Sequence, residues 1–158
     1  MGLFDKLFGK KDKDQNNNAA MSTDFTFSDK LMDEESFWKI IQTRLMSLRF
    51  EIEEYLNDNP SKLLTLESVV SNFLIVLNLP FRKFAMFLDT TDSNLKKYVT
   101  GERKFNIDLA LKFGHFFHTS PELWLKLQLK NELIELNNKK ETKQYAKYDY
   151  RKVIGVLE

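Results

Sequence analysis

The 158-residue chain has no cysteine, 3 prolines and 5 glycines. The missing thiols exclude disulfides, thiol nucleophiles and cysteine-based zinc or iron–sulfur sites. No apolar run approaches the roughly 20 residues that cross a bilayer, and no signal-peptide core opens the chain, so we expect a cytoplasmic protein. Few helix breakers beside 42% hydrophobic and 30% charged residues favour a helical globular chain with one core.

Motifs for catalysis and for cofactor binding are missing as well. There is no glycine-rich phosphate loop, and no base is placed beside a nucleophile by a known motif. The two histidines, His115 and His118, lie three residues apart without a third ligand at helical spacing, so we expect surface histidines and no metal site. We therefore expect neither an enzyme nor a cofactor or small-molecule substrate.

Charge is segregated along the chain although the formal net charge is only +1. Residues 33–58 contain seven acids and three bases, whereas residues 80–105 contain six bases and three acids. The first stretch would repel a polyanion and the second would attract one. The six bases are Arg82, Lys83, Lys96, Lys97, Arg103 and Lys104.

Residues 1–32 divide into a short amphipathic start and a Lys-, Asp- and Asn-rich linker with little to bury. The start either lies on a membrane surface or forms a tail that docks on protein or stays mobile. We favour the tail, because two turns of isolated helix are marginal, and do not expect membrane binding. The apolar residues of the start are Leu3, Phe4, Leu7 and Phe8.

A long amphipathic helix is predicted within residues 33–60, ending before Pro60. Its apolar stripe either packs on its own domain or pairs with a second copy of the chain, and the spacing does not decide between them. The stripe consists of Phe37, Ile41, Leu45, Leu48, Ile52 and Tyr55.

Further helices are predicted on either side of Pro80. The first covers residues 66–79. Its cap at Thr65 is weak, because Glu67 follows two residues later and the capping box requires an acid three residues later. Pro80 suits the first turn of the next helix. Residues 81–101 then predict two short helices joined by a tight turn. Ala85 is the small residue where steeply crossing helices touch, Asp89 stands at the left-handed turn position, and Thr91 caps the second helix. The surrounding apolar contacts are Phe84, Leu88, Leu95 and Tyr98.

This pattern resembles the phage-repressor, or XRE, type of helix-turn-helix protein over about residues 64–119. It is more closely similar to HigA-type antitoxins through the run Thr119-Ser-Pro-Glu-Leu-Trp-Leu-Lys-Leu-Gln128, in which Thr119 or Ser120 caps a helix, Pro121 opens it and Trp124 anchors it. The resemblance implies an all-α, five-helix phage-repressor-like domain over residues 61–136, with the long helix as an N-terminal extension and residues 137–158 as a basic tail. The scaffold positions are Ala85, Leu88, Asp89, Leu95, Gly101 and Trp124.

The resemblance implies that the second helix of the pair enters the major groove of double-stranded DNA. Lys97 would donate to guanine, while Asp92 would either accept from cytosine or only stabilise the first turn of its own helix. Lys96, Arg103 and Lys104 would meet phosphates. The residues expected at the DNA are Thr91, Asp92, Ser93, Lys96, Lys97, Arg103 and Lys104.

Two functions follow from this resemblance. The first is a dimeric, sequence-specific transcriptional regulator, specifically the autorepressing antitoxin of a partner mRNA-interferase toxin. The alternative is a protein-interaction module that has lost DNA readout, because Phe81 stands where the family usually has a polar phosphate contact and Asp92 has the charge that DNA repels.

Residues 139–152 contain six bases and two acids, interleaved with Tyr145, Tyr148 and Tyr150. Such a tail either contacts DNA backbone or an acidic protein, or is simply solvated, which we favour because charge runs usually are. In the solvated case the last apolar residues are expected to dock as a short strand. These are Val153, Ile154, Val156 and Leu157.

Overall fold

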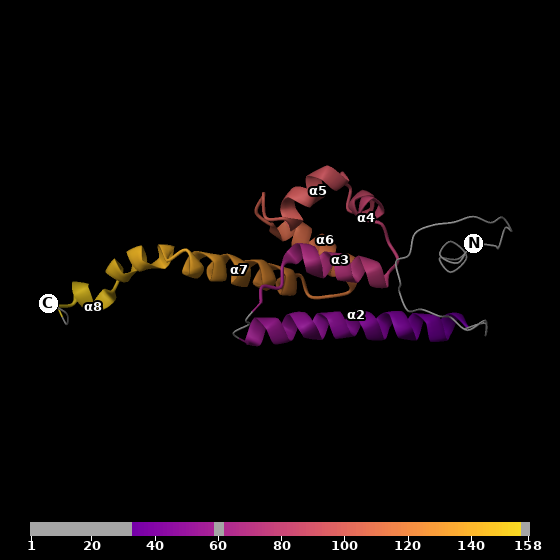
Figure 1. Cartoon of the computed structure of the whole chain (residues 1–158), viewed down its shortest axis with the longest axis horizontal. Helices are drawn as coiled ribbons and strands as arrows, with labels where there is room; N and C mark the ends of the chain where they lie inside the picture. The colour runs from indigo at the N-terminus through magenta and orange to yellow at the C-terminus, as the bar shows by residue number, and fades with distance from the viewer. Residues whose placement is uncertain (1–32, 59–61, 156–158) are drawn as a thin grey trace. The chain divides into compact units, whose positions relative to one another are not determined.

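The computed structural model describes residues 33–58 and 62–155, and these residues form helices and no strand, as the all-α prediction requires (Figure 1). The chain divides into two compact units, residues 1–44 and 45–158. The amphipathic start and linker lie outside the described residues. The elements are α2 (Glu34–Asn57), α3 (Leu66–Val76), α4 (Phe81–Phe87), α5 (Asp92–Val99), α6 (Ile107–Phe117), α7 (Pro121–Asn138), the 3-10 helix η1 (Glu141–Lys147) and α8 (Tyr150–Val153).

In the first unit, the described residues are those that begin α2. The Asp33 carboxylate accepts hydrogen bonds from the Ser36 backbone N–H at 2.7 Å and from the Ser36 hydroxyl at 3.0 Å. These bonds favour the charged carboxylate and hold the pKa of Asp33 below its usual value. Glu34 and Glu35 follow in the first turn, where negative charge suits the positive end of the helix dipole.

The second half of α2 belongs to the core of residues 45–158. Ile52 is 1% exposed, and the buried Tyr55 hydroxyl donates to Asn131 Oδ1 at 2.5 Å. Asn131 Nδ2 in turn donates to the Leu64 carbonyl at 2.9 Å, so this buried amide is satisfied on both sides. For residues 45–57, the apolar stripe therefore packs on its own domain, which was one of the two alternatives that the spacing left open.

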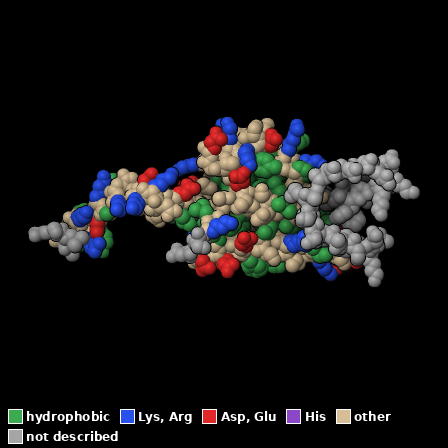
Figure 2. Space-filling view, viewed as in Figure 1, with side chains coloured by type: hydrophobic (Ala, Val, Ile, Leu, Met, Phe, Trp, Pro, Cys, Tyr) green, Lys and Arg blue, Asp and Glu red, His purple; other side chains and the backbone are tan. Residues whose placement is uncertain are grey.

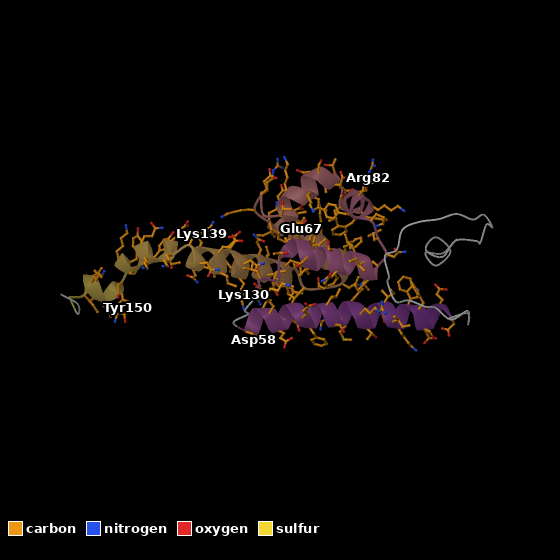
Figure 3. All side chains as sticks on the ribbon, viewed as in Figure 1. Asp58, Glu67, Arg82, Lys130, Lys139 and Tyr150 are labelled. Carbon is orange, nitrogen blue, oxygen red and sulfur yellow. The ribbon has the colours of Figure 1, made fainter. Side chains whose placement is uncertain are left out.

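Lys130 of α7 holds the C-terminal end of α2 (Figure 3). Its ammonium donates to the carbonyl oxygens of Tyr55, Leu56 and Asp58, with 3.0 Å to the Leu56 oxygen. The last turn of α2 carries no basic residue of its own. A cation from α7 therefore satisfies carbonyls that the helix leaves without intrahelical partners.

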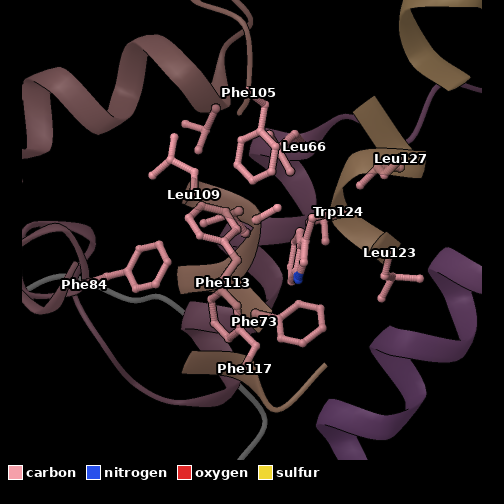
Figure 4. Close-up of a cluster of buried hydrophobic side chains, with 14 of the residues drawn as sticks. Leu66, Phe73, Phe84, Phe105, Leu109, Phe113, Phe117, Leu123, Trp124 and Leu127 are labelled. Carbon is pink, nitrogen blue, oxygen red and sulfur yellow. The ribbon is translucent and has the colours of Figure 1, made fainter. Parts of the chain in front are cut away.

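An aromatic cluster forms the centre of the core (Figure 4). The Trp124 ring lies 5.5 Å from that of Phe73 and 5.2 Å from that of Phe113, both edge to face, and Phe84 lies 5.3 Å from Phe113. Trp124 is fully buried, and its indole N–H donates to the Thr119 hydroxyl at 2.8 Å. The predicted anchoring role of Trp124 is confirmed, and its one polar atom is satisfied.

Most predicted helix ends are confirmed. Ser120 caps α7 by accepting from the Glu122 N–H at 3.3 Å, with Pro121 in the first turn. Thr65 accepts from the Ser68 N–H at 3.1 Å, a cap without the reciprocal acid.

Two helix ends near Pro80 differ from prediction. The helix α3 ends at Val76 instead of residue 79, because Asn78 adopts a left-handed φ of +48° that no helix continues through. Pro80 is the N-cap residue before α4, with extended backbone, and so lies just outside the first turn of that helix.

The predicted C-terminal strand is wrong for the residues that the structure describes. Val153 ends α8 and is 87% exposed, Ile154 follows it and is 63% exposed, and Val156 and Leu157 lie outside the described residues. Asp149 caps α8 by accepting from the Arg151 N–H at 3.0 Å. The Arg151 guanidinium also bonds this carboxylate and lowers the pKa of Asp149. A local cap therefore decides the conformation, since residues 33–58 and 62–155 offer no sheet edge on which a strand could dock.

Within the described residues, no single helix is long and apolar enough to cross a membrane. The helices α3 and α4 meet that test of length and composition only as a pair, bent by 96° at the break between them. The apolar residues responsible include Phe73, Phe84 and Ala85, which are fully buried in the core.

Candidate nucleic-acid interface

The helices α4 and α5 cross at a contact made by small and apolar side chains. Phe84, Ala85 and Leu95 are fully buried there, and Leu88 is nearly so. Asp89 has a φ of +57°, and the Thr90 N–H donates back to the Ala85 carbonyl at 3.1 Å, which reverses the chain between the helices. The predicted left-handed turn at Asp89 is thus confirmed.

The first turn of α5 is capped and exposed. The Thr91 hydroxyl accepts from the Asn94 N–H at 3.2 Å, as predicted. Asp92 Oδ1 accepts from the Ser93 N–H at 2.9 Å, so this carboxylate has a partner within its own helix. Thr91, Asp92 and Ser93 are all exposed to solvent, and a polar surface therefore stands at the positive end of the α5 dipole.

The exposed side chain of Lys96 forms an intramolecular ion pair. Its ammonium forms an ion pair with the carboxylate of Glu67 in the first turn of α3 and lies 5.8 Å from the centroid of the Phe81 ring. Glu67 appears among the labelled side chains of Figure 3. Lys96 was expected at a phosphate, and its pairing with Glu67 was not predicted, because the two residues are 29 positions apart in the chain.

Lys97 and Arg103 are also held beside α5. Lys97 Nζ lies 3.9 Å from a Glu102 carboxylate oxygen, a long ion pair between exposed side chains. Arg103 Nη1 donates to Asn94 Oδ1 at 2.8 Å, and Asn94 Nδ2 donates to the Thr90 hydroxyl at 2.9 Å. Asn94 therefore positions Arg103 near the start of α5, a role that the sequence did not reveal.

Three cations on this side of the domain make no hydrogen bond or ion pair with any residue in the described part of the chain: Arg82, Lys83 and Lys104. All three are exposed, and Arg82 projects from the first turn of α4 (Figure 3). Figure 2 shows basic side chains over α4 and α5 with acidic ones among them. The face is therefore mixed in charge, and its unengaged cations flank α5 instead of lying at its first turn.

No group of three or more potential metal-ligating side chains is found among residues 33–58 and 62–155. His115 is exposed on α6, and His118 ends that helix in a left-handed conformation with φ +54°. The described surface near α5 therefore presents hydroxyl, carboxylate, ammonium and guanidinium groups, which suit hydrogen bonding and ionic contacts.

Comparison with known proteins identifies a relative in Haemophilus influenzae that is described as an uncharacterized HTH-type transcriptional regulator. The two sequences are 30% identical over 78 residues, which cover 49% of this chain and 73% of the relative. No protein-family model matches the chain. No solved structure matches it either.

Proposed function

Because the chain belongs to the helix-turn-helix transcriptional regulators, we propose that it is a sequence-specific regulator that reads double-stranded DNA with α5 and acts by binding, without catalysis. The observation that carries this proposal is the exposed first turn of α5 on a buried helix-turn-helix contact. In such a scaffold the N-terminal residues of the second helix meet base edges, while the first helix crosses the DNA backbone.

The proposal assigns different roles to the exposed polar residues. Thr91 and Ser93 offer hydroxyls to base edges, and Lys97, held only by a 3.9 Å ion pair, is free to turn to guanine. The cations without partners in the described residues, Arg82, Lys83 and Lys104, meet phosphates. Asp92 stabilises the start of α5 through the Ser93 N–H, so it needs no base partner.

A binding titration over a salt series, with the DNA upstream of the protein's own gene, tests the proposal. We expect specific binding whose log affinity falls linearly with the log of the salt concentration. The slope should be roughly −0.9 for each phosphate contact. Lys97→Ala should weaken specific binding by about 1–3 kcal/mol, the usual contribution of a base contact. The matched control is Lys126→Ala, since Lys126 is exposed on α7 and lies outside the proposed interface. Equal affinity for unrelated DNA, or equal losses in both variants, would contradict the proposal.

A protein-interaction module on the same scaffold is the second candidate. The ion pair of Lys96 with Glu67 favours it, because this pair withdraws a cation from the face that would meet DNA. Phe81 adds an apolar ring where a phosphate contact is usual in the resembled family. In the same titration, DNA binding that depends neither on salt nor on the DNA sequence would support this second candidate over the first.

We further propose that the chain is a HigA-type antitoxin that represses its own operon and neutralises an mRNA-interferase toxin. What supports this is the resemblance of residues 119–128, whose Ser120 cap, Pro121 and buried Trp124 have the expected geometry. Co-expression with the adjacent reading frame tests it. The antitoxin should relieve growth inhibition by that product and co-purify with it, and an adjacent product that is harmless alone would contradict this part of the proposal only.

A further inference from the structure

The C-terminal arm, residues 139–155, carries aromatic rings that the fold does not use. Neither η1 nor α8 contains a buried residue, and apart from two half-buried side chains every residue of the arm is exposed. Tyr145 is 56%, Tyr148 73% and Tyr150 74% exposed. A single exposed ring needs no explanation, but three exposed rings so close in the chain form a patch that is typical of a binding surface.

Two of these rings lie side by side. Side chains three residues apart in a 3-10 helix point the same way, and Tyr145 in the last turn of η1 and Tyr148 at its end keep this relation. Their ring centroids are 6.3 Å apart, with the planes inclined by 37°. The Lys147 ammonium lies 4.9 Å from the centroid of the Tyr148 ring. The pair therefore offers flat apolar surface next to a positive charge.

The cations of the arm are mostly without internal partners. The arm contains six bases and two acids. The side chains of Lys139, Lys140 and Lys143 make no hydrogen bond or ion pair with any residue that the structure describes, whereas Arg151 is held by the Asp149 carboxylate at 2.7 Å. Figure 2 shows basic side chains along this part of the chain, and Figure 3 labels Lys139 at its start. The arm therefore attracts polyanions.

The combination of rings and cations distinguishes between polyanions. Duplex DNA presents phosphates to the cations but keeps its bases paired and stacked, so the tyrosine rings would have no base face to contact. A single strand offers phosphates to the lysines and base faces to the rings at the same time. A membrane surface is a poor fit, because α8 has only four residues and isolated helices below about 12 residues are marginal.

We propose that the C-terminal arm binds single-stranded nucleic acid, with bases stacked on Tyr145 and Tyr148 and phosphates paired with Lys139, Lys140 and Lys143. The shared chemistry is a phosphate chain with unpaired bases, which single-stranded DNA and RNA both provide. These residues are not those assigned to duplex DNA, so the proposal goes beyond the proposed function and does not rest on it. Because every base has a π-face, the preference for sequence should be small.

Fluorescence anisotropy of the full chain with labelled oligothymidylate and oligouridylate, each of roughly 12 nucleotides, tests the proposal. We expect binding whose log affinity falls with the log of the salt concentration, with a slope of roughly −0.7 for each lysine engaged. The double variant Tyr145→Ala with Tyr148→Ala should bind at least about tenfold more weakly, because each base stack contributes a factor of about five or more. The tighter of the two strands identifies DNA or RNA as the source.

Two controls separate stacking from other effects. The double variant Tyr145→Phe with Tyr148→Phe keeps both rings and should bind as the wild type does. Phe50→Ala removes a ring of α2 that is 54% exposed and lies outside the arm, and it should also leave binding unchanged. Circular dichroism verifies that each variant is folded.

Three outcomes of the titration would overturn the proposal. The first is that neither strand binds. The second is that the double alanine variant binds as well as the wild type, because phosphate contacts alone would then explain the affinity. The third is that polyglutamate binds more tightly than either strand, which would identify an acidic protein as the partner.

Photocross-linking locates the bound strand. A strand that contains 5-iodouridine, which cross-links to stacked aromatic side chains on irradiation, should attach to Tyr145 or Tyr148. Attachment within residues 81–105 instead would place the strand on the surface around α5 and overturn the assignment to the arm.

The inference and the proposed function fail separately. A chain that binds single strands through its tyrosines but shows no preference among duplex sequences contradicts the regulator alone. A chain that reads its operator but ignores single strands contradicts the arm alone.

Discussion

At the scale of single residues, the helices of residues 62–155 end where the backbone turns left-handed. Asp89, His118 and Lys140 have positive φ at the ends of α4, α6 and α7 respectively. Side chains with a Cβ adopt this conformation at a cost, and Asp is among the least penalised. Asp89 therefore makes the turn possible with a modest strain that glycine would not have.

We expect Asp89→Gly to stabilise the protein by about 0.5 kcal/mol, because glycine adopts the φ of +57° without steric strain. The control is Ser93→Gly in the exposed first turns of α5, where glycine has no such advantage and should destabilise by about 0.5–1 kcal/mol. Urea unfolding of both variants provides the measurement. Equal destabilisation by the two substitutions would refute the strain at Asp89.

Gly114 marks a second residue-scale constraint, where α6 approaches the start of α7. A Cβ at this position would lie 2.9 Å from Pro121 Cγ and 3.0 Å from the Thr119 carbonyl oxygen. We expect Gly114→Ala to destabilise the fold by about 1–2 kcal/mol, since overpacking outweighs the better helix propensity of alanine. Thermal unfolding measures this, and a raised melting temperature would show that the helices separate easily.

At the scale of elements, α7 organises the fold through contacts in several directions. Its buried face holds the aromatic cluster, and Asn131 and Lys130 reach the end of α2 and the segment after it. The Asn131 side chain links two elements, because the Tyr55 hydroxyl and the Leu64 carbonyl both depend on it. Docking of the second half of α2 therefore rests on polar as well as apolar contacts.

We expect Lys130→Met to lower the free energy of unfolding by about 1–2 kcal/mol, since methionine keeps the apolar stem but leaves the carbonyls of α2 without their charged donor. Lys126→Met on the same helix is the matched control and should be nearly neutral, because Lys126 is exposed. Denaturant titration followed by tryptophan fluorescence compares them. If the two variants unfold alike, the Lys130 contacts contribute nothing.

At the scale of the whole molecule, the surface around α5 balances attraction and repulsion for a polyanion. Glu67 and Glu102 each pair with a lysine of α5, and Asp92 adds a third carboxylate. Arg82, Lys83 and Lys104 remain available on either side. DNA binding would then depend on exchanging internal ion pairs for phosphate contacts, which weak exposed pairs permit.

Glu67→Gln should therefore strengthen DNA binding severalfold at low salt, because it releases Lys96 and removes a negative charge near the phosphates. The loss in stability should stay below about 1 kcal/mol, as for other exposed pairs. Glu135→Gln, exposed on α7, is the control for the change in net charge alone. A gain of equal size in both variants would point to overall charge instead of the release of Lys96.

Much of the local structure was readable from spacing over a few residues. Ala85 at the helix crossing, the turn at Asp89, the Thr91 cap and the Ser120-Pro121 start of α7 all depend on neighbours within about four positions, and all were predicted. Capping and helical periodicity are interactions of that range, so they leave a local pattern in the sequence. The sequence therefore established the helix-turn-helix itself.

Only the tertiary structure decided which surfaces are used and which remain free. The pairing of Lys96 with Glu67 and the placement of Tyr55 against Asn131 join residues far apart in the chain. Such contacts depend on how whole helices come together, and the same local pattern allows several arrangements. For that reason the periodicity of residues 33–60 could not choose between a core and a dimer, and Val153 and Ile154 were wrongly expected to form a strand.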